Sequence, residues 1–105
     1  MLDKELIATL NTKVEGENKS KDIQIFTLST CMWCKKCKRY LNDKNVEYSY
    51  IDMDKIQYAQ KKQILDFLKV TYKERISYPF LICDGKAIVG YNPEKYEKML
   101  KSGAD

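Results

Sequence analysis

Two cysteines separated by two residues, Cys31 and Cys34, follow directly on a short segment in which apolar side chains alternate with polar ones. Residues 23–27 read Ile-Gln-Ile-Phe-Thr, a pattern that predicts a β-strand, and a polar turn then leads into a predicted helix over about 32–44. Two thiols at this spacing on a strand-to-helix turn can close and reopen a disulfide.

The length and composition of the chain limit the alternatives. Its 105 residues, of which 44% are hydrophobic, support one core and one domain, and a chain of this size needs no disulfide framework to fold. Residues 1–5 carry charges of both signs, so no signal peptide is expected, and no run approaches the ~20 apolar residues of a membrane span. We therefore expect a soluble cytoplasmic protein. In that reducing compartment, paired cysteines are more often catalytic or metal-binding than structural.

The charge pattern argues against a nucleic-acid partner, and the lack of a long apolar run argues against a membrane partner. Lys and Arg outnumber Asp and Glu by 19 to 15, giving a net charge of +4, but the excess forms no long basic tract and no aromatic residues interleave with it. The densest patch, Lys35, Lys36, Lys38 and Arg39, follows the paired cysteines. It is either a solvated helix face or a set of cations that favours a nearby thiolate.

The remaining pattern predicts the order α-β-α-β-α-β-β-α. The further elements are a helix within 2–11, a strand at 46–52, a helix over about 56–70, strands at 80–83 and 86–89 around the turn Asp84-Gly85, and a last helix capped by Asn92 with Pro93 in its first turn. After the first helix, this is the order of the thioredoxin fold. We expect an α/β domain over 22–105 with a four-stranded mixed sheet flanked by helices, its first two strands parallel, preceded by an N-terminal helix and connection over 1–21.

The position of the two thiols predicts different roles for them. Cys31 opens the helix, where free backbone N–H groups and the helix dipole favour a thiolate, so it is the candidate nucleophile. Cys34 lies one turn further in and can attack the resulting mixed disulfide. The chain contains no His, so activation is left to the helix terminus, local N–H donors and cations.

A metal site is the main alternative chemistry. Cys31, Cys34 and Cys37, with Cys83 as a fourth ligand, could hold zinc or an iron–sulfur cluster. However, residues three apart in a helix are rotated by about 300°, which places Cys34 and Cys37 on one inward stripe rather than around an open loop. We expect Cys37 and Cys83 to be buried core residues, with redox sensing or metal binding as their alternatives, and no metal site. A partner-binding adaptor of the same fold would have little need for both thiols.

Two further local signals lie near the predicted turns. Trp33, between the paired cysteines, is expected to shape the site or its docking surface, because its ring is usually partly exposed. The bond between Tyr78 and Pro79 enters a strand and can be cis, which would offer the backbone of Tyr78 to an incoming extended chain. From the sequence alone, an ordinary proline at a strand start is the more favoured interpretation.

From Ile23 to Leu100 the chain resembles the glutaredoxin family of the thioredoxin superfamily. Cys31-Met32-Trp33-Cys34 is similar to the family's active-site tetrapeptide, Ser77-Tyr78-Pro79 to its Thr-Val-cis-Pro element, and Gly90-Tyr91 to its glycine-rich turn before the last helix. The resemblance implies a thiol-disulfide oxidoreductase in which Cys31 and Cys34 are catalytic. It also implies that substrate is bound by Met32, Trp33, Tyr78, Pro79, Gly90 and Tyr91.

The departures from the family pattern bear on the electron donor. Leu28 stands where many members carry a Lys or Arg for the glutathione carboxylate, Met32 replaces the usual Pro, and Tyr91 replaces the second Gly of a pair. The run from Gly90 is more similar to the ribonucleotide-reductase redoxins of the NrdH type, which are recycled by a protein reductase. We therefore expect a monomer that has no cofactor beyond the Cys31–Cys34 disulfide, reduces protein disulfides, and is recycled by a thioredoxin-reductase-like or ferredoxin-linked protein. A glutathione-dependent glutaredoxin is the alternative.

Overall fold

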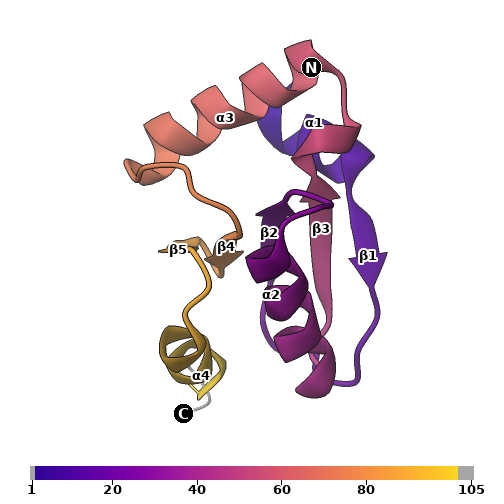
Figure 1. The fold of residues 1–105 in the computed structure, drawn as a ribbon, viewed down its shortest axis with the longest axis vertical. Helices are drawn as coiled ribbons and strands as arrows, with labels where there is room; N and C mark the ends of the chain where they lie inside the picture. The colour runs from indigo at the N-terminus through magenta and orange to yellow at the C-terminus, as the bar shows by residue number, and fades with distance from the viewer. Residues whose placement is uncertain (1, 102–105) are drawn as a thin grey trace.

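The computed structural model describes residues 2–101, and it contains two layers of helices around one mixed sheet (Figure 1). The elements are α1 (Asp3–Leu10), β1 (Thr12–Val14), β2 (Ile23–Thr27), α2 (Met32–Asp43), β3 (Tyr48–Asp52), the 3-10 helix η1 (Met53–Lys55), α3 (Tyr58–Tyr72), β4 (Phe80–Cys83), β5 (Lys86–Val89) and α4 (Pro93–Lys101). The strand order is β1-β3-β2-β4-β5. Strands β2 and β3 are parallel, and the other neighbouring pairs are antiparallel.

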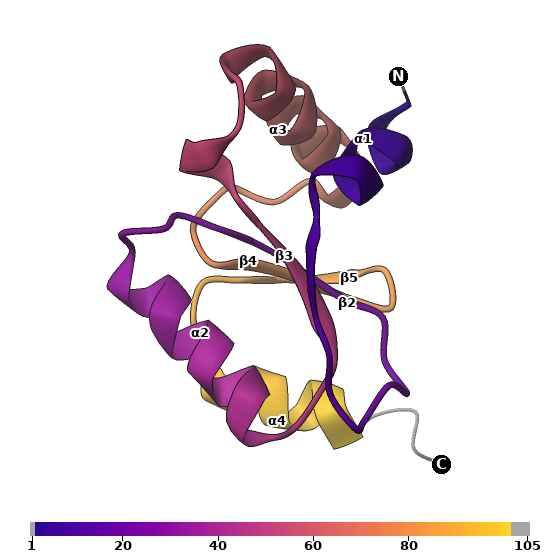
Figure 2. The same cartoon turned by 90° about the vertical axis from the view of Figure 1, so that its right-hand side faces the viewer.

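The predicted thioredoxin fold is confirmed. Helices α2 and α4 cover one face of the sheet, and α1 and α3 cover the other (Figure 2). Strands β2, β4 and β5 begin and end at the predicted residues, whereas β3 begins two residues later than predicted and α3 is displaced by two residues towards the C-terminus. The hairpin turn has positive φ at both Asp84 and Gly85, as the favoured two-residue hairpin turn requires.

The prediction of four strands was wrong, because the sheet has a fifth. Strand β1 pairs antiparallel with β3, in a register that places Thr12 opposite Tyr50 and Val14 opposite Tyr48. A strand is recognised in a sequence by the alternation of apolar and polar residues, and three residues are too few to show this pattern. The segment after α1, predicted as a surface connection only, therefore contributes an edge strand.

The N-terminal segment is also fixed to the body of the protein after β1. The amide of Asn18 donates to the carbonyl of Asn45 at 3.0 Å, and its carbonyl accepts from the amide of Glu47 at 2.9 Å. Gly16 passes so close to this backbone that a Cβ atom there would lie 2.6 Å from the amide nitrogen of Glu47. Only glycine fits such an approach without displacement of one of the two segments.

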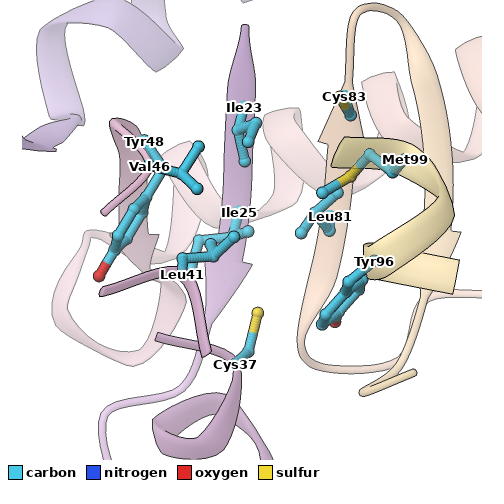
Figure 3. Close-up of a cluster of buried hydrophobic side chains, with 10 residues drawn as sticks. All are labelled: Ile23, Ile25, Cys37, Leu41, Val46, Tyr48, Leu81, Cys83, Tyr96 and Met99. Carbon is cyan, nitrogen blue, oxygen red and sulfur yellow. The ribbon is translucent and has the colours of Figure 1, made fainter. Parts of the chain in front are cut away.

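The sheet separates two buried clusters. Alternation along β2 sends Ile23 and Ile25 to one side and Phe26 to the other. The cluster on the α2 and α4 side is drawn in Figure 3, where Cys37 and Leu41 of α2 and Tyr96 of α4 point towards the sheet. The cluster on the other side contains Leu6 from α1 and Ile64 and Leu68 from α3. These two cores hold the carboxyl end of β2 and the first turn of α2 in a fixed relation.

Among the described residues, no helix has the length and apolar character needed to cross a lipid bilayer.

Candidate active site

The two paired cysteines lie at the first turn of α2. Cys31 is at the protein surface, and Cys34 is buried in the interior. Cys31 is the N-cap residue, with extended backbone angles, and its Sγ accepts a hydrogen bond from the backbone N–H of Cys34 at 3.3 Å. Cys31 is partly exposed, whereas Cys34 is 1% exposed. Both are free thiols. One sulfur is therefore open to a reaction partner and held by an N–H donor, while the second is enclosed behind it.

The surroundings of Cys34 keep its sulfur protonated. Burial, and next the hydrogen bond to the Cys31 side chain, raise the pKa of Cys34 from 9.0 to about 12. The backbone N–H of Leu28 donates to the Cys34 sulfur at 3.5 Å and acts in the opposite direction. At neutral pH the inner sulfur is thus a thiol that can donate a hydrogen bond to the outer one.

The loop that leads to Cys31 is held by two carboxylates from the neighbouring strand and 3-10 helix. Thr27 Oγ1 donates to Asp52 Oδ1 at 2.6 Å, and the N–H of Ser29 donates to Asp54 Oδ1 at 2.8 Å. The Ser29 hydroxyl donates to the other oxygen of Asp54, and these bonds to Ser29 lower the pKa of Asp54. Contacts with β3 and η1 therefore fix the conformation of the loop.

Lys38, on α2, completes this support. Its Nζ lies 3.2 Å from Asp52 Oδ1, in a pair whose side chains are 24% and 19% exposed, and 3.8 Å from the centre of the Tyr50 ring. Lys35, Lys36 and Arg39, the rest of the basic patch, are exposed. The patch is consequently divided: three side chains are solvated, and Lys38 joins α2 to β3.

An apolar ledge borders the outer thiol. Met32 and Trp33 are 66% and 54% exposed, and the ring of Trp33 stacks on that of Tyr91 with 5.9 Å between centroids. Lys36 Nζ lies 4.6 Å from the Trp33 ring centre. The predicted exposure of Trp33 is confirmed, and we call Met32, Trp33 and Tyr91 the aromatic ledge.

The Tyr78 and Gly90 segments meet next to the thiols. The peptide bond between Tyr78 and Pro79 is cis, as the family resemblance implied, and the side chain of Pro79 is fully buried. The Pro79 carbonyl accepts from the Gly90 amide at 2.8 Å. Burial, and next the electrostatic influence of Cys34, raise the pKa of Tyr78. The eight residues singled out from the sequence thus lie around one end of the sheet.

The other two cysteines lie away from this arrangement. Cys37 is 0% exposed, and burial raises its pKa to about 11, although a hydrogen bond with Tyr96 acts against the rise. Cys83 is paired with Ile23 at the start of β2, whereas Cys31 follows the end of that strand. Within residues 2–101, no three His, Cys, Asp or Glu side chains are grouped so as to hold a metal ion. Both cysteines are buried core residues, as predicted.

Sequence reasoning missed Ser29, Asp52 and Asp54. Their spacing carries no motif, and the contacts arise only because parallel pairing sets Thr27 opposite Asp52 and so brings the ends of β2 and β3 together. A signal did exist in a weak form, since the ends of adjacent parallel strands meet at one edge of the sheet and both strands end in polar residues.

Comparisons with known proteins agree on one family. The family model described as Glutaredoxin matches residues 23–88. A glutaredoxin-like 8.6 kDa protein in the rubredoxin operon of Clostridium pasteurianum is 29% identical over 79 residues, covering 75% of this chain and 97% of that protein. The glutaredoxin of Methanosarcina mazei superposes with a TM-score of 0.76 at 27% identity over 87% of each chain. Methanoredoxin of Methanosarcina acetivorans gives 0.74 at 30% identity, over 82% of this chain and 90% of its own.

Proposed function

The chain belongs to the glutaredoxin family, and from this membership and the arrangement of its thiols we propose that it reduces disulfides of other proteins through Cys31 and Cys34. The observation that carries the proposal is the unequal placement of the two sulfurs. One is reachable at a helix N-cap and accepts an N–H hydrogen bond, and the other is buried and protonated one turn further in.

The exchange proceeds in two steps that leave atoms and electrons balanced. The thiolate of Cys31 attacks one sulfur of the partner's disulfide, forms a mixed disulfide and expels the other partner sulfur as a thiolate. Cys34 then loses its proton and attacks the Cys31 sulfur, which closes the Cys31–Cys34 disulfide and releases the partner as a dithiol. Two electrons pass from the chain to the partner. A reductase must return two electrons and two protons for the next cycle.

The surface around Cys31 supports a protein partner over glutathione. Leu28 offers no cation to the carboxylate of a small peptide, and Tyr91, whose ring stacks on Trp33, stands where a second glycine would leave room. The aromatic ledge instead presents apolar area next to the thiol, which suits a side chain of an extended protein segment. We place Tyr78 and Pro79 on the opposite border of that segment.

The source of electrons is proposed to be a protein. The relative from Clostridium pasteurianum belongs to a rubredoxin operon, which supports a connection to an electron-carrier system. A thioredoxin-reductase-like or ferredoxin-linked reductase fits this setting. We place the reaction in the cytosol and assign it to the monomer.

The test combines three cysteine variants with two reducing systems. Insulin reduction is followed with either NADPH and a thioredoxin reductase, or glutathione and glutathione reductase. Cys31→Ser should abolish activity, and Cys34→Ser should retain the first step and accumulate the mixed disulfide, detectable by mass spectrometry. Cys37→Ala, which alters another buried cysteine of the same helix, should retain activity.

Each outcome decides between named possibilities. Activity that survives in Cys31→Ser would overturn the assignment of the nucleophile. Rapid turnover with glutathione and not with the protein reductase would identify a glutathione-dependent glutaredoxin, which is the alternative function. Reduction with the protein reductase alone supports the proposal.

A further inference from the structure

A hollow of about 510 Å³ lies between the β4–β5 hairpin and α4. Its floor is apolar and is formed by the side chains of Cys83, Ile88 and Met99. We call it the basic groove, because lysines from three separate segments surround this floor. Its volume is in the range of pockets that take small organic molecules.

The basic groove is separate from the candidate active site. The hairpin turn after Cys83 and the first turn of α2 lie at opposite ends of the sheet (Figure 2). The strand register also places Cys83 and Cys31 at opposite ends of the sheet. Cys83 pairs with Ile23, the first residue of β2, whereas Cys31 lies beyond the last residue of that strand. In Figure 3, Cys83 and Met99 lie together at the end of the cluster away from Cys37. The thiol exchange therefore makes no use of the groove.

The charge around the groove is one-sided. Lys86 comes from β5, and Lys95 and Lys98 come from one side of α4, three residues apart. Within residues 2–101, no carboxylate lies within ion-pair distance of these three lysines. The fourth, Lys21, is 4.0 Å from Asp84, which is the single acidic residue of the lining.

A concave surface of this kind attracts one class of ligand. Like charges around a hollow with low-dielectric walls focus their potential into it and raise the local concentration of anions. The apolar floor adds an attraction for hydrocarbon that a hydrated inorganic anion does not satisfy. The two features together require a ligand with both an apolar body and a negative group.

We propose that the basic groove is a binding site for a small amphipathic organic anion, with its apolar body on Cys83, Ile88 and Met99 and its acidic group among Lys86, Lys95 and Lys98. A carboxylate or a phosphate monoester would satisfy the same ammonium groups. Binding at this end of the sheet is independent of the proposed disulfide reduction.

Octanoate is a suitable probe, and the experiment follows the amide resonances of the ¹⁵N-labelled full chain during titration. We expect saturable shifts at residues 83–88 and 95–99, with the amides around Cys31 unmoved. Acetate, which has the head without the tail, and octylammonium, which has the tail with the opposite charge, should each bind at least about tenfold more weakly. Octyl phosphate serves as a second arm that distinguishes a phosphate from a carboxylate ligand.

Charge-reversal variants locate the site. Lys95→Glu with Lys98→Glu should weaken octanoate binding by at least about tenfold. Lys61→Glu with Lys69→Glu makes the same change of charge on α3, at another hollow lined by lysines, and should leave binding unchanged. Retained disulfide reduction and an unchanged circular dichroism spectrum show that each variant is folded.

The proposal would be overturned by an absence of saturable shifts at the groove, by equal binding of octylammonium, or by equal weakening through the α3 substitutions. Shifts confined to the aromatic ledge would assign the affinity to the thiol end and would equally exclude the groove.

Discussion

Asp54 accepts two hydrogen bonds from Ser29, one from the backbone N–H at 2.8 Å and one from the hydroxyl, and so fixes the loop that precedes Cys31. The carboxylate is on the surface, yet both of its oxygens are used by one residue. This pairing joins η1 to the active-site loop. It also makes the loop sensitive to a single side chain that takes no part in the thiol chemistry.

Asp54→Asn is expected to loosen the loop. The amide of Ser29 loses a charge-assisted acceptor, so its hydrogen exchange should accelerate several-fold, and the rate of disulfide reduction should fall several-fold. Asp66→Asn, which changes an exposed carboxylate on α3, is the control and should change neither rate. A variant with normal reduction and unchanged exchange at Ser29 would show that the loop is held by other contacts.

The same pair predicts an effect of acid. Hydrogen bonds from Ser29 lower the pKa of Asp54, so the ionised carboxylate stabilises the folded protein at pH values above the ordinary pKa of an aspartate. That contribution is lost as the pH falls through the lowered value. Protection of the Ser29 amide, measured by NMR, should therefore decrease only in strong acid, and the Asp54→Asn protein should lack this dependence.

Buried thiols predict a loss of stability in alkali. Burial raises the pKa of Cys34 to about 12 and that of Cys37 to about 11, from 9.0. The folded state retains these protons above pH 9 while the unfolded chain releases them, so the free energy of unfolding decreases as the pH rises through 9–12. The slope is at most about 1.4 kcal/mol per pH unit for each thiol.

Urea unfolding at several pH values between 8 and 11 measures this slope. Cys37→Ala should make it shallower, because one titrating group is removed. At neutral pH, alkylation by iodoacetamide followed by mass spectrometry should label Cys31 before the three buried thiols. Equal labelling of Cys31 and Cys34 would contradict the described difference between the outer and inner sulfurs.

The aromatic ledge predicts a change in substrate affinity. Trp33→Ala removes the exposed ring of the ledge, which we propose packs against the substrate segment. Loss of an aromatic contact with the substrate, worth about 0.5–1.5 kcal/mol, should raise the KM for a protein disulfide about two- to tenfold. We expect kcat and the reduction of a small disulfide such as cystine to change little. Tyr58→Ala removes another exposed aromatic ring, on α3, and serves as the matched control. A fall in kcat alone would assign Trp33 to the chemistry rather than to docking.

Gly16 predicts a stability effect far from the thiols. A Cβ at this position would lie 2.6 Å from the backbone of Val46 and Glu47, so Gly16→Ala must displace one segment. We expect a loss of about 1–3 kcal/mol in urea unfolding. Glu15→Ala, at the exposed preceding residue, should stay within about 0.5 kcal/mol of the parent protein.

Local patterns allowed much of this fold to be predicted. The alternation at Ile23–Thr27, the turn residues Asp84 and Gly85, and Asn92 before Pro93 each specify an element through nearby residues. Asn92 indeed caps α4, with its Oδ1 accepting from the amide of Lys95 at 3.1 Å. The thiol pair was located for the same reason, since its spacing and its place at a helix start are both local.

What could not be predicted depends on distant residues. Strand β1 forms because it pairs with Tyr48 and Tyr50 of β3. The residues Thr12–Val14 carry no pattern that predicts this pairing. Likewise, Lys38 was indistinguishable from its basic neighbours until α2 was placed over β3, where it meets Asp52. The cis bond before Pro79 followed from resemblance alone.

Strand β1 protects the protein against aggregation through an exposed sheet edge. Because β1 covers one side of β3, the backbone donors and acceptors there are already paired, and the edge that faces outward is a strand of only three residues. Short edge strands are poor templates for aggregation. A chain that lacks residues 1–22 would expose the longer edge strand β3. We expect such a chain to precipitate under conditions in which it is still folded.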